Sequence, residues 1–124
     1  MYPRVAFIDD DKSILESIKL LFKDEPYELY VFVNPFEAIK EISEKEFALV
    51  IVDLIMPQIK GNDVIKEIHR IQPWTECMLM TVNTYLVDEV HSARKVIEKP
   101  WNVIELKETV KQSILLSEDI PGTQ

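Results

Sequence analysis

The sequence predicts a single α/β domain, a doubly wound five-stranded parallel sheet with five helices, of which the fourth is short. The first observation behind this is that short apolar runs alternate five times with amphipathic stretches along the 124 residues. The second is that these runs are continuously apolar, as in strands buried on both faces by helices. The third is the composition, 47% hydrophobic and 29% charged, which is typical of a globular domain with one core.

The first two units have the clearest signals. Residues 5–8 predict a buried strand, followed by apolar side chains at helical spacing. Residues 28–33 are rich in β-branched and aromatic residues and predict the second strand. Asn34, Pro35 and Glu37 then predict a helix start, because Asn caps a helix, Pro fits its first turn and Glu completes a capping box.

The next units are shorter. Residues 47–52 predict the third strand, and Gly61 opens a helix that Pro73 ends. Residues 76–80 predict the fourth strand, and residues 96–97 a minimal fifth strand. Between these two strands, the apolar positions that allow a short fourth helix are Val82, Leu86, Val90 and Ala93.

The last helix is well signalled at its start. Asn102 caps it and Glu105 completes a second capping box. The expected inward stripe of this helix consists of Val103, Leu106, Val110 and Ile114. We expect one domain over residues 1–117, with residues 118–124 forming a tail or the start of a linker. Five β-then-α units are best accommodated by the flavodoxin-like strand order 2-1-3-4-5.

Charge and composition exclude several kinds of partner. The net charge of −8 argues against a nucleic-acid-binding surface and against adhesion to an anionic membrane. The single cysteine, Cys77, excludes an internal disulfide and is expected to be a buried, inert thiol. No run resembles a signal peptide or reaches the length of a membrane span, so we expect a cytoplasmic protein.

Reactive side chains follow four of the predicted strands. They are Asp9 and Asp10, Asp53, Thr81, and Lys99. The carboxyl ends of parallel strands meet at one edge of a sheet, so we expect these groups to lie together. Clustered carboxylates favour a hard cation such as Mg²⁺, and a carboxylate can also accept a phosphoryl group. Mg²⁺ and a lysine would supply the positive charge that phosphoryl transfer needs.

Each of these residues also has a purely structural interpretation. Asp9, Asp10 and Asp11 would cap the first helix, and Asp53 would be a turn residue. Thr81 would be an ordinary strand-end threonine and Lys99 a solvated loop cation. These readings do not explain why all four strand ends carry such residues.

The chain resembles the receiver domain of two-component response regulators from about residue 4 to residue 116. The matching residues are Ile8-Asp9-Asp10-Asp11, Asp53-Leu54-Ile55-Met56-Pro57 with Gly61, Thr81, and Lys99-Pro100-Trp101. The order and spacing of this set are specific, although any single part of it would not be.

The resemblance implies a signalling switch rather than an enzyme, one that at most catalyses its own phosphorylation and dephosphorylation. Asp53 would accept a phosphoryl group from a histidine kinase or a histidine phosphotransfer protein. The implied Mg²⁺ ligands are Asp9, Asp10, Asp53 and the backbone carbonyl of Ile55. Lys99 and Thr81 would bind the phosphoryl oxygens, and Thr81 would move to do so. The fourth and fifth helices are the implied surface for a homodimer or an effector.

Three features depart from the family pattern. Val96 stands where the family often has an aromatic switch residue. Thr81 and Lys99 are 18 positions apart, about four fewer than the resemblance implies, or roughly one helical turn. Ile55 and Asn83 occupy positions that tune phosphoryl hydrolysis in relatives, and we expect the apolar Ile55 to slow it.

Two other functions remain open from the sequence. One is a pseudo-receiver, an interaction module that does not depend on phosphorylation. The complete set of acidic residues argues against it, whereas Val96 and the short fourth helix leave it open. The other is a Mg²⁺-dependent phosphohydrolase of the haloacid dehalogenase type with Asp9 as nucleophile, although no acidic pair follows Lys99 and 124 residues leave no room for a cap.

Overall fold

The computed structural model describes residues 2–82 and 95–118. Five parallel strands form one sheet in the order β2-β1-β3-β4-β5, which confirms the predicted order. The strands are β1 (Arg4–Ile8), β2 (Glu28–Phe32), β3 (Leu49–Asp53), β4 (Glu76–Thr81) and β5 (Lys95–Glu98).

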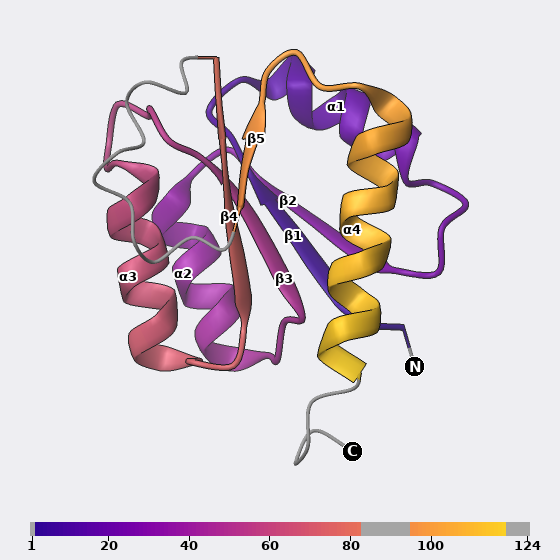
Figure 1. The fold of residues 1–124 in the computed structure, drawn as a ribbon. Helices are drawn as coiled ribbons and strands as arrows, with labels where there is room; N and C mark the ends of the chain where they lie inside the picture. The colour runs from indigo at the N-terminus through magenta and orange to yellow at the C-terminus, as the bar shows by residue number, and fades with distance from the viewer. Residues whose placement is uncertain (1, 83–94, 119–124) are drawn as a thin grey trace.

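Helices cover both faces of the sheet (Figure 1). They are α1 (Lys12–Leu21), α2 (Pro35–Glu44), α3 (Gly61–Ile71) and α4 (Val103–Glu118). Helices α2 and α3 lie on one face, and α1 and α4 lie on the other. The described residues thus hold four helices rather than five, because the expected fourth helix falls almost wholly on residues 83–94, outside the described part of the chain. Helix α4 corresponds to the expected fifth helix.

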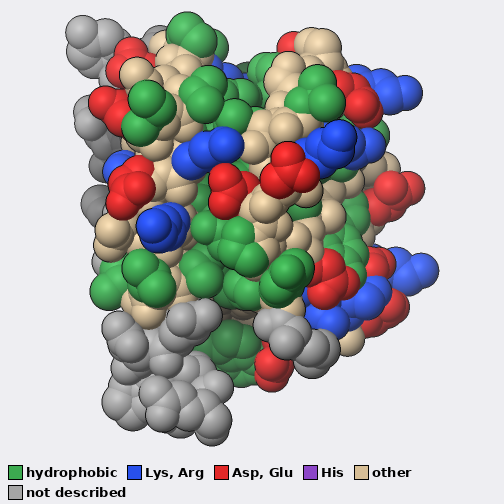
Figure 2. All heavy atoms as spheres, turned by 90° about the vertical axis from the view of Figure 1, so that its right-hand side faces the viewer, with side chains coloured by type: hydrophobic (Ala, Val, Ile, Leu, Met, Phe, Trp, Pro, Cys, Tyr) green, Lys and Arg blue, Asp and Glu red, His purple; other side chains and the backbone are tan. Residues whose placement is uncertain are grey.

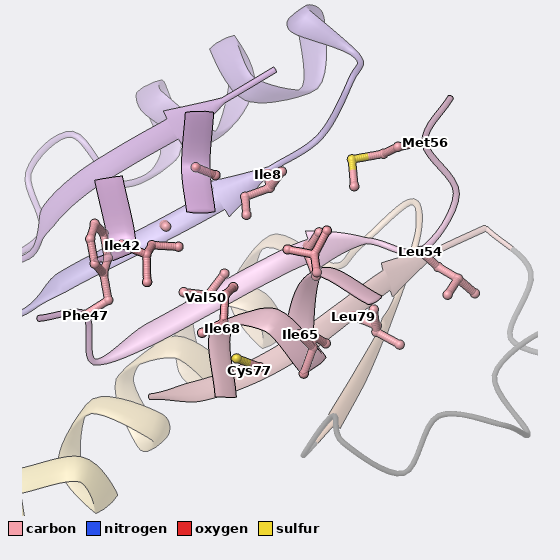
Figure 3. Close-up of a cluster of buried hydrophobic side chains, with 14 residues drawn as sticks. Ile8, Ile42, Phe47, Val50, Leu54, Met56, Ile65, Ile68, Cys77 and Leu79 are labelled. Carbon is pink, nitrogen blue, oxygen red and sulfur yellow. The ribbon is translucent and has the colours of Figure 1, made fainter. Parts of the chain in front are cut away.

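Two buried clusters fill the spaces between the sheet and its helices. On the α2 and α3 side, Ile8, Val50 and Leu79 from three strands pack with Ile65 and Ile68 of α3 (Figure 3). The other face of the same strands packs against α1 and α4. Because each central strand is buried on both faces, its sequence is continuously apolar.

Cys77 lies on β4 in the first of these clusters. Burial, reinforced by the charge of neighbouring Glu76, raises the pKa of its thiol to about 12. This agrees with the expectation of a buried, inert thiol.

Helix starts follow the sequence signals. The side chain of Asn34 accepts from the N–H groups of Phe36 and Glu37 at 2.8 and 3.4 Å. The side chain of Asn102 likewise accepts from the N–H of Glu105 at 3.1 Å. These contacts pair N–H groups that have no partner inside the first turn of a helix.

The third strand begins at Leu49, later than the expected residue 47. Phe47 is buried, but its N–H donates to Oε1 of Gln72 at 3.2 Å instead of joining the sheet. The same Gln72 donates through Nε2 to the carbonyls of Ile42 and Lys45. A buried glutamine therefore fixes the chain before β3, which apolar periodicity does not reveal.

Candidate functional site

Four strand ends carry the candidate residues to one edge of the sheet. Asp53 is the last residue of β3 and Thr81 the last of β4, while Asp9 and Lys99 directly follow β1 and β5. Backbone bonds continue the ladder past the strands, since the N–H of Lys99 donates to the carbonyl of Thr81 at 2.9 Å. The N–H of Asp9 likewise donates to the carbonyl of Phe32 at 3.1 Å. The side chains are therefore held on rigid backbone.

Lys99 lies between two acidic side chains. Its Nζ is 2.6 Å from Oδ2 of Asp9 and 3.4 Å from Oδ2 of Asp53. The lysine side chain is 10% exposed and that of Asp9 is fully buried. Charges removed from water in this way are stable only when they are paired. Charged Lys99 and the charged carboxylates of Asp9 and Asp53 therefore stabilise each other.

The carboxylates also accept backbone hydrogen bonds. Oδ1 of Asp9 accepts from the N–H of Asp11 at 2.9 Å, and Oδ1 of Asp53 accepts a longer bond from Ile55 at 3.4 Å. Burial raises the pKa of Asp53, and the negative charge of Asp9 raises it further, while Lys99 and the Ile55 N–H act in the opposite direction. Asp53 therefore carries a charge that its surroundings only partly compensate.

The acidic residues suit a magnesium ion. Asp9, Asp10 and Asp53 each offer a carboxylate oxygen, and these oxygens lie within 4.8 Å of one another. Asp9 and Asp53 are buried, while Asp10 is exposed and leaves one side open to water. Mg²⁺ prefers oxygen ligands from a few carboxylates together with water, so the donor set fits this ion.

The three consecutive aspartates have different positions. Asp9 points to Lys99, Asp10 belongs to the acidic cluster, and Asp11 caps α1 by accepting from the N–H of Ser13 at 2.9 Å. The hydrogen bonds from Ser13 lower the pKa of Asp11. The capping interpretation thus holds for Asp11 and not for its two neighbours.

The remaining predicted residues differ in their surroundings. Thr81 is buried, whereas Ile55 is 53% exposed. Val96 packs against the cluster on the α2 and α3 side. Asn83 lies outside the described residues.

Gly61 supports Asp53 through the backbone, a role that the sequence did not predict. Its N–H donates to the carbonyl of Leu54 at 2.9 Å. A Cβ atom at position 61 would lie 2.4 Å from the carbonyl oxygen of Asp53 and 2.9 Å from the Cα of Leu54. Only glycine allows α3 to begin this close to the end of β3. The glycine itself was visible in the sequence, but the close approach was not.

Comparison with known proteins identifies the family. Residues 5–111 match the model of the response regulator receiver domain. The DNA-binding response regulator MtrA of Mycolicibacterium smegmatis is 27% identical over 126 residues, covering 98% of this chain and 55% of its own length. The chain spans about half the length of the curated relatives it matches.

Solved structures agree in fold. The signal receiver domain of a putative LuxO repressor protein from Vibrio parahaemolyticus is 29% identical, with a TM-score of 0.86 over 95% of this chain and 94% of that one. The response regulator TrrA from Thermotoga maritima, in complex with Mg²⁺-BeF, is 31% identical, with a TM-score of 0.82 over 90% of this chain and 98% of that one.

None of the described helices is long and apolar enough to cross a membrane.

The family match gives no support to a phosphohydrolase of the haloacid dehalogenase type. The paired lysine and carboxylates at the strand ends, the strand order and the match over residues 5–111 lead to one conclusion: the chain belongs to the receiver domain family of two-component response regulators, which are signalling switches.

Proposed function

We propose that this receiver domain accepts a phosphoryl group on Asp53 from a histidine kinase or a histidine phosphotransfer protein. The contrast between the two buried aspartates carries the proposal. Asp9 is fully buried and bonded to Lys99 at 2.6 Å, whereas Asp53 keeps 11% of its side chain exposed at a longer 3.4 Å from the same lysine. Asp53 is thus the less constrained nucleophile.

In the proposed reaction, a carboxylate oxygen of Asp53 attacks phosphorus while the bond from phosphorus to the donor nitrogen breaks. The leaving imidazole keeps the electron pair of that bond and takes up a proton. Mg²⁺, when bound by Asp9, Asp10, Asp53 and the carbonyl of Ile55, supplies positive charge at the transferred oxygens. Lys99 supplies a second positive charge from 3.4 Å away from Asp53. The Mg²⁺-BeF complex of the related TrrA supports the assignment of Mg²⁺.

Thr81 is the proposed switch residue. It ends β4 beside Lys99, whose N–H its carbonyl accepts, and it is buried. We assign its hydroxyl to a phosphoryl oxygen, which would alter the chain that follows Thr81. Val96 replaces the aromatic partner of this movement, so Thr81 acts without it.

The proposed function also includes the extent of the domain, its location in the cell and the surface that passes on the signal. The domain comprises residues 1–117, with residues 118–124 as a tail or the start of a linker, and it works in the cytoplasm. The expected fourth helix, outside the described residues, and α4 form its surface for a homodimer or an effector. Any binding of DNA belongs to another domain or partner, as the net charge of −8 suggests.

Ile55 and Asn83 are proposed to set the lifetime of the phosphoryl group. Ile55 is apolar and exposed beside Asp53, so it hinders an attacking water. In Ile55→Asn, we expect dephosphorylation about ten times faster, roughly 1.4 kcal/mol in barrier height. The decay of phosphoprotein on an acrylamide gel with immobilised metal measures this rate. An unchanged or slower rate would show that Ile55 does not shield the site.

The proposed function is tested by intact mass spectrometry after treatment with acetyl phosphate and Mg²⁺. We expect wild type to gain one phosphoryl group and Asp53→Asn to gain none. Asp24→Asn, which alters an exposed loop carboxylate, is the matched control and should behave as wild type. A wild type that gains no mass would favour the pseudo-receiver instead.

A further inference from the structure

A short loop carries two members of the acidic cluster from β1 to α1, and both of its ends are fixed. At the β1 end, the N–H of Asp9 donates to the carbonyl of Phe32 at 3.1 Å. At the α1 end, Asp11 is the N-cap residue of the helix. Asp10 lies between them, exposed, and its side chain has no hydrogen bond or ion pair to any residue that the structure describes. The backbone on either side therefore sets the position of Asp10.

Asp11 connects the start of α1 to the acidic cluster. Its Oδ1 accepts from the N–H of Ser13 at 2.9 Å and from the Oγ of Ser13 at 2.6 Å. These bonds hold the backbone of Asp11 at φ −87° and ψ 105°, the extended conformation of a helix cap. The N–H of Asp11 in turn donates to Oδ1 of Asp9 at 2.9 Å. The helix cap and the orientation of Asp9 thus depend on the same residue.

Both oxygens of the Asp9 carboxylate have a donor. Oδ2 is 2.6 Å from Nζ of Lys99, and Oδ1 accepts from the N–H of Asp11. The side chain of Asp9 is fully buried, so bulk water does not replace a donor that is lost. Rotation of this carboxylate is therefore opposed from two sides, one of which is the cap of α1.

The bonds of Asp11, rather than its charge, distinguish it from other acidic residues. The chain has 22 acidic and 14 basic residues. Figure 2 shows acidic side chains spread among basic and hydrophobic ones over one face of the molecule. An exposed carboxylate is therefore common in this protein, and its charge is screened by water. A carboxylate that fixes the donor to a buried acidic side chain is not common.

The cap of α2 shows what a cap without this connection looks like. The side chain of Asn34 accepts from the N–H groups of Phe36 and Glu37 at 2.8 and 3.4 Å. Asn34 has no hydrogen bond to the acidic cluster within the described ranges. The two helices thus begin with the same kind of cap, and only the cap of α1 is bonded to a carboxylate of the cluster.

We propose that Asp11, held by Ser13, is a positioning residue for the Mg²⁺ ligands Asp9 and Asp10. This rests on the proposed function, which has Mg²⁺ at this site, and adds a residue that does not itself touch the ion. Ligands of a metal ion are held in place by hydrogen bonds from surrounding groups, and loss of such a group typically weakens metal binding by about 10–100-fold. Asp11 acts through its acceptor oxygen, which keeps its own N–H on Asp9 and fixes the backbone beside Asp10.

Titration with Mg²⁺ alone, followed by two-dimensional NMR at constant ionic strength and without a phosphoryl donor, tests this proposal. We expect Asp11→Ala to bind Mg²⁺ about tenfold more weakly than wild type. Asp11→Asn removes the charge but keeps an acceptor oxygen for Ser13, and Asn caps helices as well as Asp does. It should therefore weaken binding much less than Asp11→Ala. Ser13→Ala, which loses only the Oγ bond, should also have a smaller effect.

Asn34→Ala is the matched control, because it removes the cap of α2. It should lower the unfolding temperature about as much as Asp11→Ala does and leave the affinity for Mg²⁺ unchanged. The proposal is overturned if Asp11→Ala binds Mg²⁺ as tightly as wild type, or if Asp11→Asn or Asn34→Ala weakens binding as much as Asp11→Ala.

The proposed phosphorylation of Asp53 is measured separately, by the mass gain with acetyl phosphate. A wild type that binds Mg²⁺ but gains no mass would contradict the proposed function and leave the role of Asp11 intact. A wild type that binds no Mg²⁺ would overturn the role of Asp11 together with the magnesium site.

Discussion

Nζ of Lys99 lies 2.6 Å from Oδ2 of Asp9, although 90 positions separate the two residues in the chain. The contact joins the ends of β1 and β5, which are not neighbours in the sheet. It crosses the end of β3, where Asp53 lies 3.4 Å from the same lysine. One buried cation thus lies between two carboxylates and compensates part of their negative charge at the centre of the site.

Replacing this cation should destabilise the protein. In Lys99→Met, Asp9 loses its ion pair while fully buried, and we expect a loss of about 3 kcal/mol in the free energy of unfolding. Urea unfolding in the presence of a chelator measures it. Lys107→Met, which breaks the more exposed pair with Glu25, should cost under about 1 kcal/mol. Equal losses in the two variants would contradict the buried pairing.

Gly61 should not tolerate a side chain. The Cβ of Gly61→Ala would meet the backbone of Asp53 at 2.4 Å, so the start of α3 or the end of β3 must shift. We expect a loss of about 2 kcal/mol in the free energy of unfolding, measured by thermal unfolding. We also expect slower phosphorylation by acetyl phosphate. Asp63→Ala changes an exposed residue in the same helical turn and should change stability by no more than about 1 kcal/mol. A fully active and stable Gly61→Ala would contradict the close approach.

The raised pKa of Asp53 predicts a pH-dependent stability difference. A carboxyl whose folded pKa lies above its unfolded value destabilises the fold at pH values above the folded pKa, where it is charged. The penalty disappears at pH values below the unfolded pKa of about 3.8. Asp53→Asn should therefore unfold at a higher temperature than wild type at pH 7, with the advantage fading near pH 3.

Calorimetry of both proteins between pH 3 and 8 checks this, in buffers free of divalent ions. Asp24→Asn controls for removal of an exposed carboxylate and should follow wild type at each pH. A lower unfolding temperature for Asp53→Asn at pH 7 would mean that Lys99 stabilises the charged Asp53 more than burial and Asp9 destabilise it.

Magnesium should stabilise the fold through Asp10. Ligand binding to the native state adds about 2.7 kcal/mol when the ion is 100 times its dissociation constant. We expect Mg²⁺ to raise the unfolding temperature of wild type, and this increase to be largely lost in Asp10→Asn. Because Asp10 is exposed, the substitution itself should cost little without metal. An equal increase in both proteins would exclude Asp10 as a ligand.

The sheet was predictable because strands buried on both faces must be continuously apolar. Residues 5–8 and β3 show this plainly, and the position of Asp53 follows from the end of such a run. The different positions of Asp9, Asp10 and Asp11 were not predictable in the same way, because three identical side chains in a row carry no directional signal. Backbone geometry at the end of β1 alone decides which one meets Lys99.

Contacts between residues far apart in the chain could not be predicted from the sequence. The close approach of Gly61 to Asp53 is a distance between two backbones, and composition does not encode it. Gln72, which fixes the start of β3 from the end of α3, looks like an ordinary polar residue after a helix. Both contacts become visible only when separate segments are placed side by side.

The central claim is that Asp53 carries the phosphoryl group, and chemical trapping tests it most directly. After treatment with acetyl phosphate and Mg²⁺, borohydride reduces an aspartyl phosphate to homoserine, and peptide mass mapping locates the change. We predict homoserine at position 53 and unmodified aspartate at positions 9 and 10. Homoserine at position 9, with Asp53 unchanged, would contradict the account.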